Sequence, residues 1–320
     1  MNMETTSEKQ RSTSASAYRR WRKRQSILKN WELYLMFLPV LLYFLIFCYW
    51  PMYGIQIAFK DFSGMKGIWG SPWTGLKHFE RFFNGSSFTE VLWNTLSISL
   101  YTLAVSFPLP VILALMLNEV RRERFKKTVQ TVTYAPHFIS TVVMCGMIML
   151  FLSPSSGIIN QFRQAIGLNT VNYMYEGKYF KTIYVLTGAW QNTGYGSIIY
   201  LSALAGVDQE QHEAAVIDGA TRLQRIWYIN IPGILPTIWI MLILQCGSVM
   251  SVGFEKVFLL MNDLNRSSAE VISTYVYKIG LQQQQYSFST AVGLFNSVIN
   301  FILLFTVNTI AKKMDQSSLF

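Results

Sequence analysis

Long stretches of this 320-residue chain carry no charged side chain. Charged residues make up only 14% of the chain and hydrophobic residues 51%, and their uneven placement excludes a pair of soluble domains. A bilayer core of roughly 30 Å needs about 20 helical residues, and a helix satisfies its own backbone hydrogen bonds. Windows of this length without Asp, Glu, Lys or Arg are Leu33–Tyr53, Leu96–Leu117, Val132–Leu152, Thr182–Leu204, Ile234–Gly253 and Ser287–Ile310. They predict an all-α integral membrane protein with six transmembrane helices.

Cysteine and histidine are also scarce, with three of each. Cys48, Cys145 and Cys246 each fall within a charge-free window and form no CxxC pair. We interpret them as small buried residues, because neither a disulfide framework nor a metal site has this spacing. We therefore expect no metal site.

The chain lacks a GxxxxGK[ST] loop, so it cannot cradle nucleotide phosphates in that way, and we expect no cofactor in this chain. The six windows contain no acidic residue, and the chain has no clear internal repeat, whereas ion-driven carriers carry ionisable residues inside their spans and often an internal repeat. Energy for any transport must then come from a separate subunit.

Positive charge is abundant, with a net charge of +10. If the amino terminus is cytoplasmic, most of the basic residues fall in inside segments, as the positive-inside tendency requires. Topology explains the charge, so we expect contact of the N-terminal basic cluster with membrane lipid and no nucleic-acid binding. The predicted parts are a basic cytoplasmic tail (1–30), a six-helix transmembrane domain (31–310) and a cytoplasmic C-terminal tail (311–320).

A polar segment, residues 206–236, separates the fourth and fifth windows. It predicts two helical pieces with a bend at Gly219, the second running over residues 220–230. Pro232 and Pro236 should then start the next spanning helix, because proline is tolerated in a first helical turn. An amphipathic helix on the membrane surface is the alternative for this segment.

The fourth window carries polar side chains near its centre. Gln191 and Asn192 lie there beside the aromatic residues Trp190 and Tyr195. Polar groups at mid-bilayer should point into the helix bundle. Amides and aromatic faces together are typical of sugar binding, so these residues are candidates for a substrate path. The alternative is that they hold membrane helices together.

Further path candidates are Gln245 in the fifth window, Glu255 just beyond it, and Asn296 and Asn300, which share one helix face. The asparagines either line a path or bond to a neighbouring helix. Glu255 could instead be an interface residue paired with a nearby Lys or Arg.

Other features concern the shape of the chain. Pro108 and Pro110 predict a kink in the second span that faces protein. The stretch YAPHFISTVV is expected to open the third span. Residues 54–90 and 256–286 are predicted to be external loops.

The polar segment resembles the EAA loop of ABC-importer permeases, whose pattern is E-A-A, three residues, G, nine residues and I-x-L-P. The matching positions are Glu213, Ala214, Ala215, Gly219, Ile229 and Pro232, with Asp218 and Ala220 flanking the glycine as in the sugar-importer branch. Ile231 replaces the usual leucine, a mild departure. The stretches SVGFEKVFLL and STAVGLFNSVINF are similar to the MalF-like and LplB-like group of oligosaccharide permeases, and the resemblance covers nearly the whole chain after Asn30.

The resemblance implies a type I ABC importer permease fold and a transport subunit in a bacterial cell membrane, multi-pass, with both termini cytoplasmic. The expected cargo is an oligosaccharide from a complex polysaccharide such as pectin or alginate. The expected partners are a second permease, two ATPase subunits that bind ATP and Mg, and an extracytoplasmic sugar-binding protein or lipoprotein. The loop residues would couple this chain to the ATPase.

Two other functions stay open at this stage. One is an ABC permease for another small solute. The other is a membrane-embedded enzyme acting on glycans or lipids, for which Asp61, His78, Glu80 and Glu255 are candidates on separate outer loops without motif spacing. We expect no catalytic residue in this chain.

Overall fold

The computed structural model describes residues 29–313, and over this range the elements are helices joined by turns and a single antiparallel bridge between Lys60 and Trp73. The prediction of an all-α chain is confirmed. The N-terminal tail up to residue 28 and residues 314–320 lie outside the described part. The helices are α2 (Trp31–Tyr43), η1 (Phe44–Tyr49), α3 (Trp50–Met52), η2 (Tyr53–Phe59), α4 (Gly67–Gly70), α5 (Lys77–Phe83), α6 (Ser87–Ser106), α7 (Pro108–Asn118), α8 (Glu123–Tyr134), η3 (Ala135–Phe138), α9 (Thr141–Phe151), α10 (Ile158–Ala165), α11 (Gly177–Leu204), α12 (Gln209–Ile217), α13 (Arg222–Arg225), η4 (Ile226–Asn230), α14 (Ile231–Cys246), α15 (Phe254–Leu260), α16 (Arg266–Ala269), α17 (Ile272–Tyr277), η5 (Lys278–Gln282) and α18 (Tyr286–Lys313).

The chain divides into two compact units, residues 1–56 and residues 57–320. The described part of the first unit is the apolar helical run formed by α2, η1 and α3 and the start of η2. Pro39 lies inside α2, and a π-helical turn follows at Phe44–Tyr49. The run from Trp31 to Phe59 is long and apolar enough to cross a membrane, as the first window predicted.

Among the described residues, four helical runs are long and apolar enough to span a bilayer: Trp31–Phe59, Ser87–Asn118, Arg222–Cys246 and Tyr286–Lys313. A fifth span results if the bent pair Glu123–Phe138 and Thr141–Phe151 counts as one. Helix α11 has 28 residues but is less apolar, because polar residues occupy its centre. The predicted number of six spans is therefore not confirmed by length and composition.

The third window is not one helix, which corrects the prediction. Helices α8 and η3 end at Phe138, and α9 begins at Thr141 after a bend of 100°. Pro136 in the last turn disfavours continuation of the regular helix. Ser140 caps the new helix, its hydroxyl accepting a hydrogen bond from the backbone N–H of Val143 at 3.4 Å. The absence of charged residues from this window gives no indication of the break.

The second window has the predicted break, because α6 ends at Ser106 and α7 begins at Pro108.

The helix in the fifth window ends earlier than predicted. Helix α14 stops at Cys246 rather than Gly253, and turns follow. The backbone N–H of Met250 there donates to Oδ1 of Asn300 in α18 at 2.9 Å, so a side chain of the neighbouring helix satisfies the freed backbone.

The two predicted external loops contain helices, which is a second correction. Residues 54–90 include α4 and α5, and Phe82 of α5 is fully buried among aromatic rings of α6, α17 and α18. Residues 254–285 form four short helices that pack on the membrane helices. These segments belong to the core rather than lying over it.

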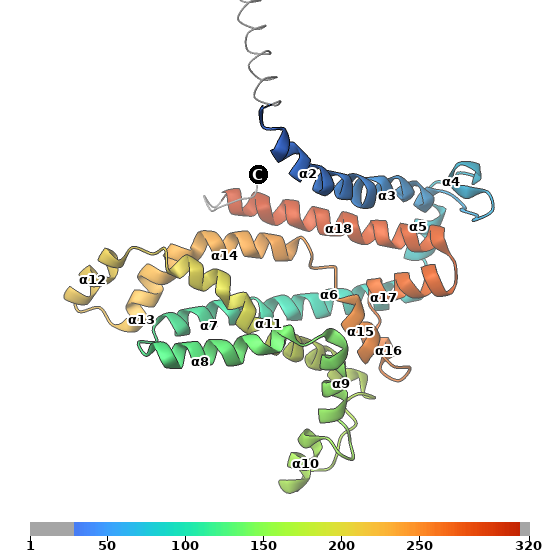
Figure 1. Cartoon of the computed structure of the whole chain (residues 1–320). Coiled ribbons are helices and arrows are strands. Elements are labelled where there is room, and N and C mark those ends of the chain that lie inside the picture. The colour runs from blue at the N-terminus through green and yellow to red at the C-terminus, as the bar shows by residue number, and fades with distance from the viewer. Residues whose placement is uncertain (1–28, 314–320) are drawn as a thin grey trace, which may run out of the picture. The chain divides into compact units, whose positions relative to one another are not determined.

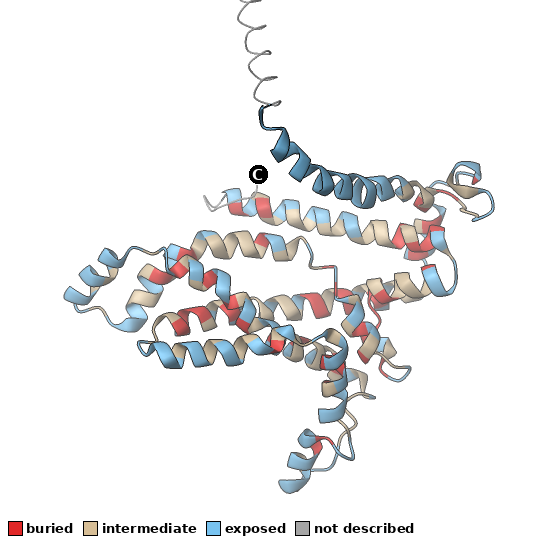
Figure 2. Ribbon diagram, in the orientation of Figure 1, coloured by how far each residue is buried: buried red, intermediate tan, exposed pale blue. Residues whose placement is uncertain are grey.

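Helix α11 is the central element of the second unit, since it packs against α6, α7, α8 and α14 (Figure 1). One buried cluster joins α7, α11 and α14 around Tyr200 and Ile234. Another joins α6, α9 and α11 to α15 around Met144 and Val257. Buried residues in Figure 2 follow these contacts, whereas α12 and α13 carry none.

Candidate functional site

The segment between α11 and α14 folds as two helical pieces with a bend at Gly219, as predicted. Asp208 caps α12 by accepting a hydrogen bond from the N–H of Glu210 at 2.9 Å. Gly219 has φ +79°, the left-handed region that favours glycine at a helix C-terminus. Thr221 then caps α13 together with Gln224 in a capping box.

The second piece does not stop at Asn230, contrary to prediction. One helical run extends from Arg222 through Cys246. Pro232 cannot donate a backbone hydrogen bond, and the turn before it, Ile226–Asn230, is π-helical. The wider turn accommodates the proline ring without ending the helix, so the loop continues into the following span without a break.

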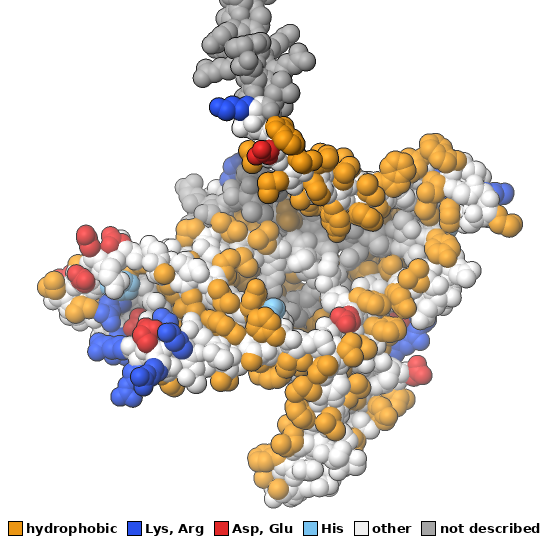
Figure 3. All heavy atoms as spheres, viewed as in Figure 1, with side chains coloured by type: hydrophobic (Ala, Val, Ile, Leu, Met, Phe, Trp, Pro, Cys, Tyr) orange, Lys and Arg blue, Asp and Glu red, His pale blue; other side chains and the backbone are white. Residues whose placement is uncertain are grey.

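Apolar side chains on this loop are exposed. Ile217 is 86% exposed and Tyr228 is 79% exposed, and Val216, Leu223 and Trp227 are also exposed. Figure 3 shows acidic and basic side chains gathered over the same loop and the start of α8. An apolar patch rimmed by charge is typical of a protein interaction site. We refer to residues 209–230 as the exposed loop.

The residues that match the EAA pattern lie along the exposed loop and just after it. Glu213, Ala214, Asp218, Gly219 and Pro232 are exposed, whereas Ala215, Ala220 and Ile229 are half-buried. The loop is fixed to the rest of the unit near its C-terminal side, where Nη2 of Arg225 lies 4.0 Å from Oε2 of Glu119. Most of the pattern residues are therefore exposed on a loop that contacts the rest of the unit.

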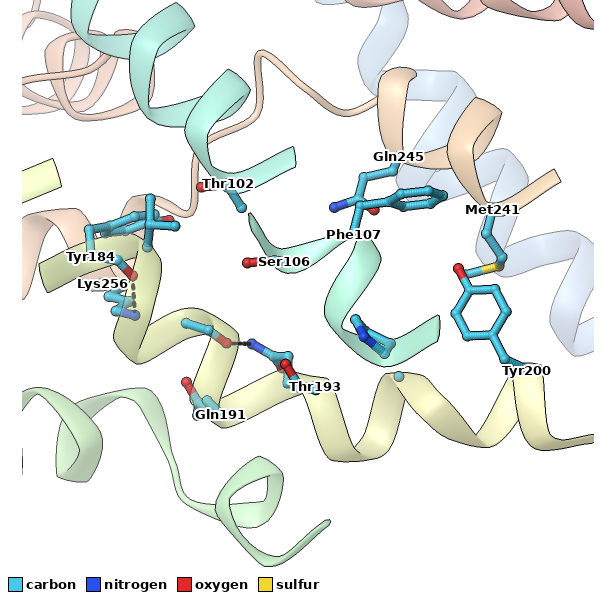
Figure 4. A pocket seen from close by; sticks show the side chains of 15 residues that line it. Thr102, Ser106, Phe107, Tyr184, Gln191, Thr193, Tyr200, Met241, Gln245 and Lys256 are labelled. Atoms are coloured by element: carbon cyan, nitrogen blue, oxygen red, sulfur yellow. Dashed lines mark hydrogen bonds between the residues drawn. The ribbon is translucent and has the colours of Figure 1, made fainter. Parts of the chain in front are cut away.

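A cavity of about 360 Å³ lies between α6, α7, α11, α14 and α15 (Figure 4). This volume is within the usual range for ligand pockets of about 300–1,000 Å³. Polar and apolar side chains alternate on its wall. The lining residues are Thr102, Ser106, Phe107, Pro110, Tyr184, Val185, Gly188, Gln191, Asn192, Thr193, Gly196, Tyr200, Met241, Gln245 and Lys256.

A second cavity of about 170 Å³ adjoins the first. Thr102, Tyr184 and Gln245 line both cavities. The second cavity continues past Ser99 and Ser248 to the backbone around Gly253. The two cavities therefore adjoin at Thr102, Tyr184 and Gln245.

The structure brings three of the predicted path residues together at the first cavity: Gln191, Asn192 and Gln245. Nε2 of Gln191 donates to the carbonyl of Ile139 at 3.0 Å, so this amide also bridges the break between η3 and α9. Nδ2 of Asn192 donates to Gly188 O at 3.0 Å. Gln191 and Asn192 therefore both line the cavity and hydrogen-bond to backbone carbonyls.

The other predicted path residues lie elsewhere. Trp190, Tyr195 and Glu255 are exposed and do not line the cavity, and Tyr195 stacks on the ring of His137 with centroids 4.0 Å apart. Asn300 hydrogen-bonds to the turn after α14, so of its two predicted roles it has the bond to a neighbouring segment rather than the path-lining one. Oδ1 of Asn296 is buried without a hydrogen-bond partner among the described residues.

Sequence reasoning missed Thr102, Ser106, Phe107, Tyr184 and Lys256. The kink at Pro108 was the available signal for the first three, because a proline break opens the helix wall just before it. Lys256 follows Glu255 directly, and only the acid was singled out. The pattern of apolar and polar residues around position 256 does not distinguish a lysine at the membrane interface from a lysine whose side chain lines a cavity.

The model of the family of binding-protein-dependent transport system inner membrane components matches residues 106–316, a range that includes the exposed loop and nearly all of the cavity. This chain belongs to that family. The permease is a multi-pass protein of the inner membrane and a transport subunit rather than an enzyme. Its fold is the type I ABC permease fold.

Two relatives of the permease come from Bacillus subtilis (strain 168). Protein LplB is 46% identical over 288 residues, covering 90% of this chain and 91% of the relative. The polygalacturonan/rhamnogalacturonan transport system permease protein YteP is 44% identical over 294 residues, covering 92% of each. Such coverage indicates that the same architecture extends over nearly the whole chain.

The permease also resembles a solved structure, a bacterial ABC transporter involved in the import of the acidic polysaccharide alginate. The TM-score is 0.85 at 40% sequence identity, covering 91% of this chain and 99% of that chain. A related structure of a bacterial alginate ABC transporter contains an alginate pentasaccharide-bound periplasmic protein and matches with the same TM-score at 38% identity.

Proposed function

We propose that this permease imports oligosaccharides derived from complex polysaccharides, as one half of a heterodimeric translocation path driven by ATP. The observation that carries the proposal is the cavity beside α11, whose amides, hydroxyls and aromatic side chains suit sugar hydroxyls and ring faces. Relatives whose names specify pectin-type or alginate transport support the same cargo class.

The exposed loop is the proposed contact with an ATPase subunit that binds ATP and Mg. Its exposed Ile217, Trp227 and Tyr228 would otherwise lie in water next to charged side chains. Burying such anchors in a groove of a partner is favourable by about 2 kcal/mol or more for each well-packed anchor. The matched residues from Glu213 to Pro232 would form this contact.

The full assembly in this proposal contains a second permease, two ATPase subunits and an extracytoplasmic sugar-binding protein or lipoprotein. Helix α11 and the bent pair of α8 and α9 would complete six spans, with both termini cytoplasmic. The basic stretch before and at the start of α8, Arg121–Lys127, supports this orientation by the positive-inside tendency.

Coupling requires a packed element with two arrangements, each favoured by a different ligand state. Closure of the ATPase subunits would favour one arrangement of the exposed loop, and arrival of the loaded binding protein the other. The unbroken helical run from Arg222 to Cys246 connects the loop to Gln245 at the cavity wall. Motion at the loop can therefore change the shape of the cavity.

Purification and sugar screening test the proposal. The tagged permease, extracted in mild detergent from its own organism, should bring with it a second permease and an ATPase. ATP hydrolysis by the reconstituted complex should rise with an oligosaccharide and its binding protein. Stimulation only by a non-sugar solute would favour an ABC permease for another small solute, and uptake without an ATPase would overturn the proposal.

A further inference from the structure

One charged side chain lines the cavity, and it is a cation. Among the described residues that form the wall, Lys256 carries a charge and the others are neutral. Figure 4 shows Lys256 beside Tyr184 at one end of the cavity, with Tyr200 and Met241 at the other. A single positive charge in an otherwise neutral polar cavity gives it an electrostatic preference for anions.

The ammonium of Lys256 is placed by two contacts with α11. Nζ donates to the carbonyl of Tyr184 at 2.9 Å and lies 4.8 Å from the centroid of the Tyr184 ring. It also lies 3.3 Å from the position that a Cβ would occupy at Gly188, so the glycine leaves room for the charged group on the cavity wall. A larger residue at 188 would displace the ammonium.

The lysine has no carboxylate partner. Among residues 29–313, no Asp or Glu forms an ion pair with Lys256. An ammonium has three N–H donors, and one hydrogen bond to a carbonyl occupies only one of them. Burial lowers the pKa of Lys256 to about 8. A half-buried charge without a carboxylate partner is costly and is typical of functional sites.

Two hydroxyl groups in the same cavity are also without partners. Oγ1 of Thr102 and Oγ of Ser106 are buried and make no hydrogen bond among the described residues. Elsewhere in the long helices, hydroxyls such as those of Thr95 and Thr193 bond back to the carbonyl four residues earlier. Thr102 and Ser106 are one helical turn apart, and both residues line the cavity that Lys256 also lines.

Resting on the proposed function, we propose that Lys256 is the residue that binds a sugar carboxylate in the translocation cavity, so that the permease selects acidic oligosaccharides over neutral ones. A carboxylate supplies the missing charge, and charge-assisted hydrogen bonds to it are about twice as strong as neutral ones. Neutral sugars leave the ammonium uncompensated.

The experiment compares trigalacturonate with its fully methyl-esterified form, which has the same sugar chain without charge. Uptake of each is measured in proteoliposomes that hold the complete transporter, with ATP inside and saturating loaded binding protein outside. The ratio of acid to ester uptake should fall by about tenfold or more in Lys256→Met, since a hydrogen bond to a charged group contributes about 1.5–3 kcal/mol. Lys256→Arg should retain most of the ratio.

A matched control is Lys178→Met, an exposed lysine of α11 that pairs with Glu176 and lies away from the cavity. It should keep the wild-type ratio. Equilibrium binding of labelled trigalacturonate to the detergent-solubilised transporter, without the binding protein, provides a second measurement and should weaken in Lys256→Met by a similar factor.

The outcomes separate the two proposals. An equal loss of acid and ester uptake in Lys256→Met, together with retained binding of trigalacturonate, would assign Lys256 a purely structural role and overturn the inference. A ratio equal to that of the wild type would also overturn it. Failure of the wild-type transporter to take up any oligosaccharide with ATP, while a non-sugar solute is taken up, would overturn the proposed function itself.

Discussion

Two segments of the permease join long helices and have opposite relations to the rest of the protein. The exposed loop between α11 and α14 has no buried residue in α12 or α13. The segment between α14 and α18, which we call the packed segment (residues 254–285), buries Val257, Leu260 and Ile272. The packed segment therefore contributes to folding, whereas the exposed apolar side chains of the loop are available to contact another molecule.

The two segments also differ in the ion pairs of their acidic residues. In the packed segment, Glu270 is 7% exposed and lies 2.9 Å from Nη2 of Arg266 and 3.8 Å from Nζ of Lys278. In the exposed loop, Glu213 and Asp218 are exposed and form no ion pair among the described residues. Removing a charge should therefore affect stability in the first segment and association in the second.

The largest effect is expected for Glu270→Gln in the packed segment. The change leaves two cations without their carboxylate, which should cost about 3 kcal/mol and lower the thermal midpoint by roughly 5–10 °C. Thermal unfolding in detergent measures it. Glu176→Gln, at an exposed pair with Lys178, is the control and should leave the midpoint in place. A midpoint unchanged in Glu270→Gln would show that the packed segment does not stabilise the fold.

The next effect is expected for Ile217→Asp in the exposed loop. The side chain is 86% exposed, so the thermal midpoint of the isolated permease should not change. Loss of a buried anchor at the interface should weaken the association with the ATPase by on the order of 30-fold, as measured by equilibrium binding. Leu281→Asp, at a 64% exposed position of the packed segment, is the control. Equal weakening in both variants would contradict the comparison.

A smaller effect is expected for Gly219→Val. A β-branched residue at φ +79° is strained by about 1–3 kcal/mol, so the bend between α12 and α13 should rearrange. ATP hydrolysis that depends on the loaded binding protein should fall by roughly tenfold, with membrane insertion retained. Gly219→Asn should recover much of this activity, because asparagine tolerates a positive φ. Wild-type coupling in the valine variant would show that the bend is not required.

The smallest effect concerns pH. Lys256 has a pKa of about 8, so its positive charge is present below that pH and is lost above it. The groups around it are the ring and carbonyl of Tyr184, Cys145 of α9 and the neighbouring Glu255. The ratio of acid to ester uptake should fall about fivefold between pH 7 and pH 9. In Lys256→Arg the ratio should stay constant over this range, and a parallel fall there would assign the effect to another group.

The sequence predicted features that depend on single residues. Gly219 predicted the bend, Pro108 predicted the break between α6 and α7, and the charge-free runs predicted helices. Each of these follows from local backbone chemistry, in which a glycine or a proline acts on its own neighbours.

Features that depend on distant partners were not predicted. The packed segment appeared as a loop because its stability depends on contacts such as Asn265 with the carbonyl of Met174, at 2.8 Å. The bend at Ser140 lies within a charge-free window, and the early end of α14 depends on Asn300 of another helix. Lys256 becomes a cavity residue only because its side chain reaches from α15 to Gly188 and the carbonyl of Tyr184 in α11. Such contacts have no local signature in the sequence.

The π-helical turn before Pro232 has a mechanical consequence. By keeping residues 222–246 in one continuous helical run, it connects Arg222 to Gln245 through a path of about 37 Å along the helix. A tilt of about 5° at the Arg222 end would displace the Gln245 end by about 3 Å, comparable to a hydrogen-bond length. An angular change too small to disturb packing could thus open or close a contact with a sugar hydroxyl at the distant cavity wall.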